Sequence, residues 1–99
     1  MANIQLFNPI SFHGSLVPGQ SAVISTGILV PVPRDNANLV FVVTARPVRT
    51  GPHVFAASVR DVNVVTNDAP GGLNLNIVVV NAHATQTLTD AIISIAAIS

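Results

Sequence analysis

The sequence of 99 residues contains no Lys, Glu, Cys, Trp or Tyr. Four Arg and four Asp are its only fixed charges, so 8% of the chain is charged, against about 25% in an average soluble domain. The absence of Cys excludes disulfides and thiolate metal sites. The absence of Tyr and Trp removes the side chains on which nucleic-acid bases most often stack.

The apolar content is high for so short a chain. Apolar residues make up 49% of the sequence and the mean hydropathy is +0.62, which is more than the interior of one small domain needs. The surplus must lie on the surface, where a large apolar area usually marks an interface. The formal net charge is zero, so attraction to nucleic acid or to an anionic membrane is weak. We therefore expect identical subunits as partners, with no nucleic acid and no membrane insertion.

The N-terminal residues do not resemble a secretory signal. Residues 1–9 contain no basic side chain, and Asn8-Pro9 interrupts the apolar stretch. The longest apolar runs, Leu39–Val43 and Ile77–Val80, are far shorter than the ~20 residues that span a bilayer. We expect a chain made in the cytoplasm without a signal peptide. The sequence does not determine its final site, for which a particle and a cell or spore surface are the candidates.

Apolar side chains recur with a period of two, which is the spacing of a half-buried β-strand. Leu73, Leu75, Ile77 and Val79 alternate with Asn at first and then with Val. Residues 39–43 are apolar at every position, and such a run is typical of a central strand covered on both sides. Helical spacing is not kept over the ~10 residues that a helix needs.

Turn residues separate these strands at regular intervals. Residues 18–19, 31–33 and 67–72 are rich in Pro, Gly, Asn and Asp, which form turns. This spacing predicts an all-β fold, a single β-sandwich of jelly-roll or immunoglobulin-like type with seven to eight short antiparallel strands. The predicted strands are 3–7, 10–17, 21–30, 38–46, 53–59, 61–66, 73–81 and 90–98.

The edges of such a sandwich lack the usual protection. Natural sheets guard their edges with Lys, inward charges or Pro, yet this chain has no Lys and its Pro residues lie at the ends of the predicted strands. Unprotected edges favour pairing with another subunit. Residues 1–9 are predicted to be an N-terminal arm or edge strand, and residues 10–99 the sandwich domain. In the first case Asn3–Phe7 adds a strand to a neighbouring subunit, and in the second it completes its own sheet.

Few side chains are available for catalysis or metal binding. His13, Ser15 and Asp61 supply the residue types of a nucleophilic triad, but the Gly-x-Ser-x-Gly pattern is absent. His13, His53 and His83 lack the short ligand spacings of metal sites, and the Asp residues fit ordinary turns rather than a calcium loop. We expect no enzymatic activity, no metal and no cofactor.

The residues most suited to an assembly interface are apolar residues near the N-terminus, one Phe and the Arg residues of the middle of the chain. Arg is enriched at protein interfaces, whereas Lys and Glu are depleted, which matches this composition. The candidates for an assembly interface are Ile4, Leu6, Phe7, Phe55, Arg46, Arg49 and Arg60.

A glycan- or surface-binding module of lectin or adhesin type is the alternative. Small β-sandwich domains include many lectins, and Asn is plentiful here. Sugar sites usually stack the ring of the sugar on an aromatic face. Phe12 and Phe41 lie in core-like patterns, which leaves Phe7 and Phe55 for such a role, although burial is the more common position of Phe.

The composition is similar to that of small jelly-roll subunits that build bacterial surface or spore fibres or that decorate phage particles. Those subunits are also rich in Val, Ile, Asn and Thr and poor in Lys and Glu, and the likeness covers the whole chain without a shared motif. Composition and edges together predict a non-enzymatic structural subunit that self-assembles into a homo-oligomer: a filament or fibre, a shell or a particle decoration.

Overall fold

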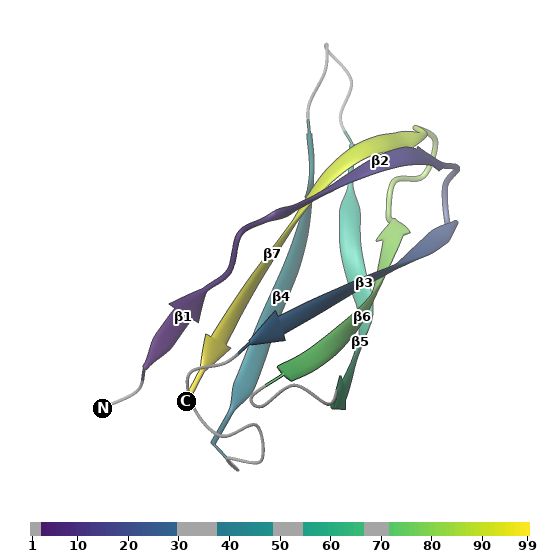
Figure 1. Ribbon diagram of the computed structural model, residues 1–99. Helices are drawn as coiled ribbons and strands as arrows, with labels where there is room; N and C mark the ends of the chain where they lie inside the picture. Colours follow the sequence, from purple (N-terminus) through teal and green to yellow (C-terminus); the bar gives the residue numbers. More distant parts are fainter. Residues whose placement is uncertain (1–2, 30–37, 49–54, 67–71) are drawn as a thin grey trace.

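The regular structure of the described chain consists of β-strands. The computed structural model describes residues 3–29, 38–48, 55–66 and 72–99. Within these ranges no helix is long and apolar enough to cross a membrane. The strands in Figure 1 are β1 (Ile4–Leu6), β2 (Ile10–Leu16), β3 (Ser21–Leu29), β4 (Val40–Pro47), β5 (Ala57–Thr66), β6 (Gly72–Asn81) and β7 (Leu88–Ile98).

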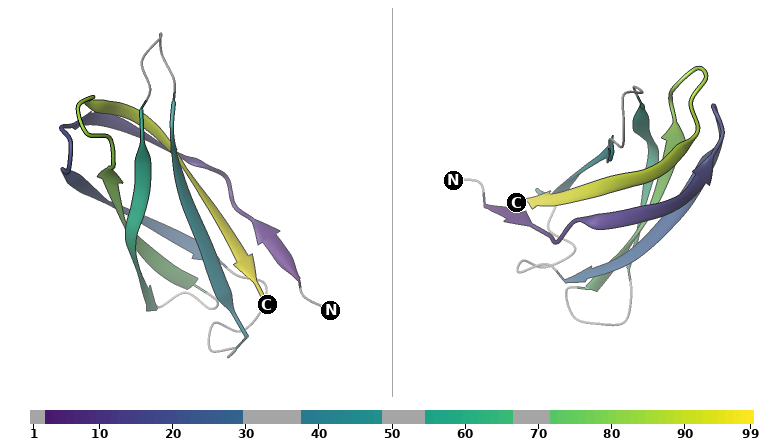
Figure 2. Two further views of the ribbon diagram at one scale, coloured as in Figure 1. Left: turned by 180° about the vertical axis from the view of Figure 1, so that it is seen from behind. Right: turned by 90° about the horizontal axis from the view of Figure 1, so that it is seen from above.

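The strands form two antiparallel sheets, each built around a long central strand, which confirms the predicted all-β class. In sheet A, β7 pairs with β4 on one side and with β1 and β2, one after the other, on its other side. In sheet B, β6 lies between β3 and β5. Figure 2 shows β1 continuing the line of β2 along β7, with β1 beside the C-terminal end of β7.

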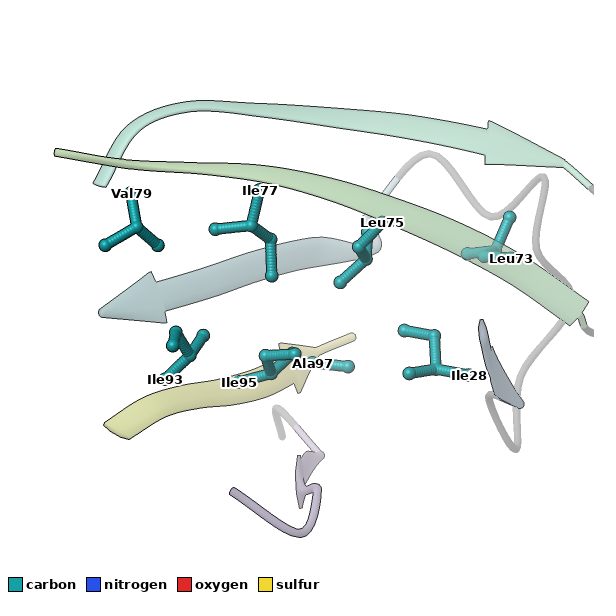
Figure 3. Packing of buried hydrophobic residues seen from close by; sticks show 8 residues of the cluster. All are labelled: Ile28, Leu73, Leu75, Ile77, Val79, Ile93, Ile95 and Ala97. Carbon is teal, nitrogen blue, oxygen red and sulfur yellow. The ribbon is translucent and has the colours of Figure 1, made fainter. Parts of the chain in front are cut away.

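One main core lies between the two sheets. Alternate residues of β6 and β7 face one another there, because the side chains of a strand point to its two faces in turn. Burying each large apolar side chain contributes about 1.5–3 kcal/mol. The buried residues are Leu73, Leu75, Ile77 and Val79 of β6, Ile93, Ile95 and Ala97 of β7, and Ile28 of β3 (Figure 3).

A tight turn carries the chain from β2 in sheet A to β3 in sheet B. The Val17 carbonyl accepts a hydrogen bond from the Gln20 amide at 2.9 Å. Pro18 and Gly19 occupy the two central positions, and Gly19 has a φ of 81°, which is the pattern of a type II turn. Because a side chain is strained at this positive φ, the turn requires glycine at position 19.

A buried Asn side chain fixes the corner where the β2–β3 turn meets the connection between β6 and β7. Asn81 Nδ2 donates hydrogen bonds to the carbonyls of Leu16, at 2.8 Å, and Gln86, at 2.7 Å. Its Oδ1 accepts one from the His83 amide at 2.9 Å. The backbone amide and carbonyl of Asn81 bond to the β2–β3 turn. All polar atoms of this buried residue therefore have partners within the chain.

The imidazole of His83 closes the connection between β6 and β7. Its Nδ1 accepts hydrogen bonds from the amides of Thr85 and Gln86, both at 3.0 Å. An acceptor at Nδ1 places the ring proton on Nε2. The ring thus satisfies two backbone amides next to the contacts that Asn81 makes.

The apolar run at residues 39–43 is not a covered central strand, so that prediction is wrong. Within the described residues β4 pairs only with β7, at the edge of sheet A. Phe41 and Val43 pack against the core, whereas Val40 and Val42 point outward and are exposed. A strand that is apolar on both faces needs a cover on both faces. The residues that the structure describes cover only the inner face of β4.

The predicted strands 53–59 and 61–66 are one strand in the structure, as far as the described residues reach. The register of β5 against β6 shifts between Val59 and Asp61, which leaves Arg60 as the additional residue of a β-bulge. A bulge bends a strand without ending its pairing. The polar pair at positions 60 and 61 is therefore accommodated within β5.

The segment Asn3–Phe7 lies along its own sheet, which is the edge-strand alternative. Asn3 and Ser99 exchange two backbone hydrogen bonds, at 2.8 and 2.9 Å, and Ile4 and Leu6 lie opposite residues of β7. In an antiparallel pair, hydrogen-bonded and non-hydrogen-bonded positions alternate. The backbone groups of Ile4 and Leu6 therefore point away from β7, toward the open edge of sheet A.

Replacing Asn81 with Ala is expected to destabilise the fold by about 3 kcal/mol, because one buried carbonyl, one part-buried carbonyl and one part-buried amide lose their partner. Urea unfolding followed by circular dichroism measures the loss. Asn63→Ala, at an exposed position of β5, is the matched control and should change the unfolding free energy by less than ~0.5 kcal/mol. Equal losses in the two variants would contradict the role of the corner.

Replacing Gln5 with Leu is expected to stabilise the fold by about 1 kcal/mol, since a buried acceptor without a partner is removed. The Gln5 side chain lies on β1, and its Oε1 is buried without a hydrogen-bond partner among the described residues. A rise in the midpoint of urea unfolding is the expected result. A fall in the midpoint would mean that the Gln5 amide contributes a favourable contact.

Candidate interaction surface

The outer face of sheet A is apolar at the end where β1 lies. β1, β7 and β4 each contribute two apolar side chains, and directly paired residues of antiparallel strands point to the same side of the sheet. The two neighbouring rows are Ile4–Ile98–Val40 and Leu6–Ala96–Val42. These six residues are called the terminal patch.

Four side chains of the terminal patch are largely open to solvent. The exposed fraction is 67% for Ile4, 79% for Leu6, 54% for Val40 and 45% for Val42. The two residues of β7 between them are half-buried. The terminal patch contains no charged or hydrogen-bonding side chain. Its surface is therefore suited to an apolar partner.

The same face of sheet A becomes polar toward the other end of β7. The row after the terminal patch pairs Thr44 with Ser94, and the next brings the exposed Arg46 opposite Ile92. The face thus changes from apolar to charged along the length of β7.

A side-chain hydrogen bond joins β2 and β7 at this polar end. His13 and Asp90 are directly paired across the two strands, with Nδ1 and Oδ1 2.6 Å apart. The Thr89 hydroxyl donates to Asp90 Oδ2 at 3.1 Å. These hydrogen bonds, that of His13 first, lower the pKa of Asp90 below its ordinary value. Because the pair is exposed, water and salt screen it and its effect on stability is small.

The outer face of sheet B differs, because amide groups occupy its centre. Asn76 of β6 pairs with Ser25 on β3 and with Asn63 on β5, and Asn74 lies in the next row. The Ser25 hydroxyl donates a hydrogen bond to Asn76 Oδ1 at 2.7 Å. The two sheets therefore present different chemistry to solvent.

The candidate interface residues do not form one surface. Ile4 and Leu6 lie in the terminal patch. Phe7 packs against the main core, and Phe55 packs against the smaller core cluster formed by Leu16, Leu88 and Ala91. Arg46 lies on sheet A and Arg60 on sheet B, while Arg49 lies outside the described residues.

The structure does not bring His13, Ser15 and Asp61 together. The partner of His13 is Asp90 on its own sheet, whereas Asp61 lies on β5 in sheet B. Among residues 3–29, 38–48, 55–66 and 72–99, no group of three His, Cys, Asp or Glu side chains is close enough to hold a metal ion. His53 falls outside these ranges.

Two polar residues whose side chains are hydrogen-bonded within the chain were not among the candidates from the sequence. Asp90 cannot be paired with His13 by inspection, since the two lie 77 positions apart. Asn81 did carry a signal, because it continues the inward alternation of Leu73, Leu75, Ile77 and Val79. A polar residue in the buried phase of a strand requires internal hydrogen bonds.

Comparison of the chain with models of protein families, with curated proteins and with solved structures finds no match. Its function is therefore argued from the surface chemistry of its two sheets.

Replacing Asp90 with Asn is expected to lower the thermal midpoint near neutral pH and to have less effect in acid. Its pKa in the folded chain lies below the ordinary value of 3.8, so the carboxylate stabilises the fold above that pH. This stabilisation is lost as the pH falls through the lowered pKa. The midpoints of the wild type and the variant should therefore converge at low pH in a thermal unfolding series.

The control for this series is Asp61→Asn, which changes an exposed carboxylate on the other sheet. Convergence of the same size in that variant would show that the His13 contact does not cause the effect.

Proposed function

We propose that the chain is a non-enzymatic structural subunit that self-assembles into a homo-oligomer. The observation that carries the proposal is the position of the exposed large apolar side chains. Among the described residues, eight of the ten such side chains lie in pairs on the strands at the edges of the sheets, while Val17 and Val48 lie singly in connecting segments. These pairs are Ile4 and Leu6 of β1, Val23 and Leu29 of β3, Val40 and Val42 of β4, and Val64 and Val65 of β5.

The charge content of the chain supports the same proposal. Soluble monomers protect the edges of their sheets with Lys, inward-pointing charges or Pro. Here the chain has no Lys, and β1 and β3 contain no charged residue at all. Exposed strands with apolar side chains and little charge repel other copies weakly. Association with identical subunits removes this apolar surface from water.

The order of the strands favours a β-sandwich of the jelly-roll type over the immunoglobulin-like type. In an immunoglobulin domain, the first strand lies beside the second, and the fifth lies between the second and the fourth. Here β7 lies between β2 and β4, and β6 lies between β3 and β5. Strands from the first half of the chain thus pair with strands from the second half: β2 with β7 and β3 with β6, while β4 lies against β5. This is the arrangement of one long hairpin that is folded over on itself. This nesting is typical of jelly rolls.

A glycan- or surface-binding module is the second candidate, and the outer face of sheet B is the observation in its favour. Asn63, Asn76 and Ser25 offer amide and hydroxyl groups in one row of that face. Against it, Phe7, Phe12, Phe41 and Phe55 all pack against core clusters, and the chain has no Tyr or Trp. Such a face lacks the aromatic ring on which a sugar usually stacks. Binding to a glycan array that is lost in Asn76→Ala would favour this candidate.

We expect the purified chain to self-associate to a similar extent at low and at molar salt. Apolar packing and strand pairing hold an interface of this composition, and added salt screens neither. Light scattering and sedimentation velocity over a concentration series measure the association, and negative-stain microscopy separates filaments from closed shells. A monomer at the highest concentration in both salts would contradict the proposed function.

A further inference from the structure

We infer that the terminal patch is the surface on which a second copy of this chain binds, with the outer faces of the two A sheets packed against each other. This inference rests on the proposed function and assigns the surface that performs it. The patch consists of two complete rows across three strands, Ile4–Ile98–Val40 and Leu6–Ala96–Val42.

The terminal patch has the shape that packing between sheets requires. Two sheets stack about 10 Å apart when apolar side chains of both faces interdigitate. The patch has one low point among its large side chains, since the small Ala96 lies between Leu6 and Val42 in one row. A second copy can place its own large side chains over this low point. The same surface then serves both copies, as in an isologous dimer.

The distribution of charge on sheet A favours binding of a second copy of the chain over binding of a charged partner. Charged and polar residues lie at the far end of the face, where Arg46, His13 and Asp90 are found. A charged partner would have no group to pair with in the terminal patch and would lose its hydration there. A second terminal patch brings no charge of its own. The charged ends of both copies stay in water when only the apolar ends overlap.

The area of the terminal patch is sufficient for a weak, specific dimer. The exposed fractions of Ile4, Leu6, Val40 and Val42 correspond to roughly 450 Å² on one copy, which is within the range of the largest apolar patch on a monomer, a patch that is often functional. Two patches with their β7 residues bury roughly 1,000 Å² in total, the lower limit of specific interfaces. Association through this surface therefore depends on concentration.

The test uses two matched double variants. Leu6→Thr with Val42→Thr makes the terminal patch polar, and Val17→Thr with Val48→Thr, the control variant, changes two exposed apolar residues that lie outside the patch and outside the strands. Threonine has a high strand propensity, and all four positions are exposed, so both variants are expected to fold. Circular dichroism and thermal unfolding verify this. Sedimentation velocity over a concentration series then gives the dissociation constant of each.

We expect the dissociation constant of the terminal-patch variant to rise at least about tenfold, and the control variant to associate as the wild type does. If both variants associate as the wild type does, or only the control variant dissociates, this inference is overturned and the proposed function stands. If the wild type itself is monomeric, the proposed function fails. A monomeric wild type whose patch binds an apolar dye, with binding lost in the terminal-patch variant, would assign the patch to a different partner.

A second measurement locates the contact directly. The chain has no Cys, so a disulfide between two copies of a variant with one introduced Cys can form only at the substituted position. Ala96→Cys, at the centre of the terminal patch, should form a disulfide-linked dimer under mild oxidation at associating concentrations. Ser25→Cys on the outer face of sheet B is the control. Faster cross-linking of the Ser25→Cys variant would overturn the inference.

Discussion

The hydrogen bonds of Asn81 hold the corner on which the arrangement of the two sheets depends. Its side chain joins the end of β2 to the connection that follows β6, and its backbone bonds to the turn between β2 and β3. Apolar contacts in the core supply most of the stabilisation, but they tolerate small shifts. A buried amide with all its partners in place tolerates few positions, so it sets how β2 and β6 meet.

The parts of the fold that follow from local pattern are predictable from the sequence. The alternation from Leu73 to Val79 identifies β6 and its inward face, and the same phase marks Asn81 as a buried polar residue. Pro18-Gly19 identifies the turn that carries the chain from one sheet to the other. In these cases a few neighbouring residues determine the backbone geometry, so no knowledge of distant contacts is needed.

The parts that depend on pairing between distant segments are not predictable in this way. The apolar sequence of β4 does not distinguish an outer face covered by the same chain from one covered by another chain. The strand order and the exposed fractions of the side chains show that the described residues leave this face exposed. The contact of His13 with Asp90 depends on the register of β2 against β7. The exposed surface of Val40 and Val42 is thus a property of topology, and it links the fold to the proposed assembly.

The position of β7 in the chain has a consequence for how the protein is made. β1, β2 and β4 all pair with β7 through backbone hydrogen bonds, and β7 follows them in the sequence. During translation these three strands leave the ribosome before their common partner exists, so sheet A forms late and contact between distant segments slows folding. Two newly made chains that meet before sheet A has closed can exchange β7, which makes domain swapping a competing reaction.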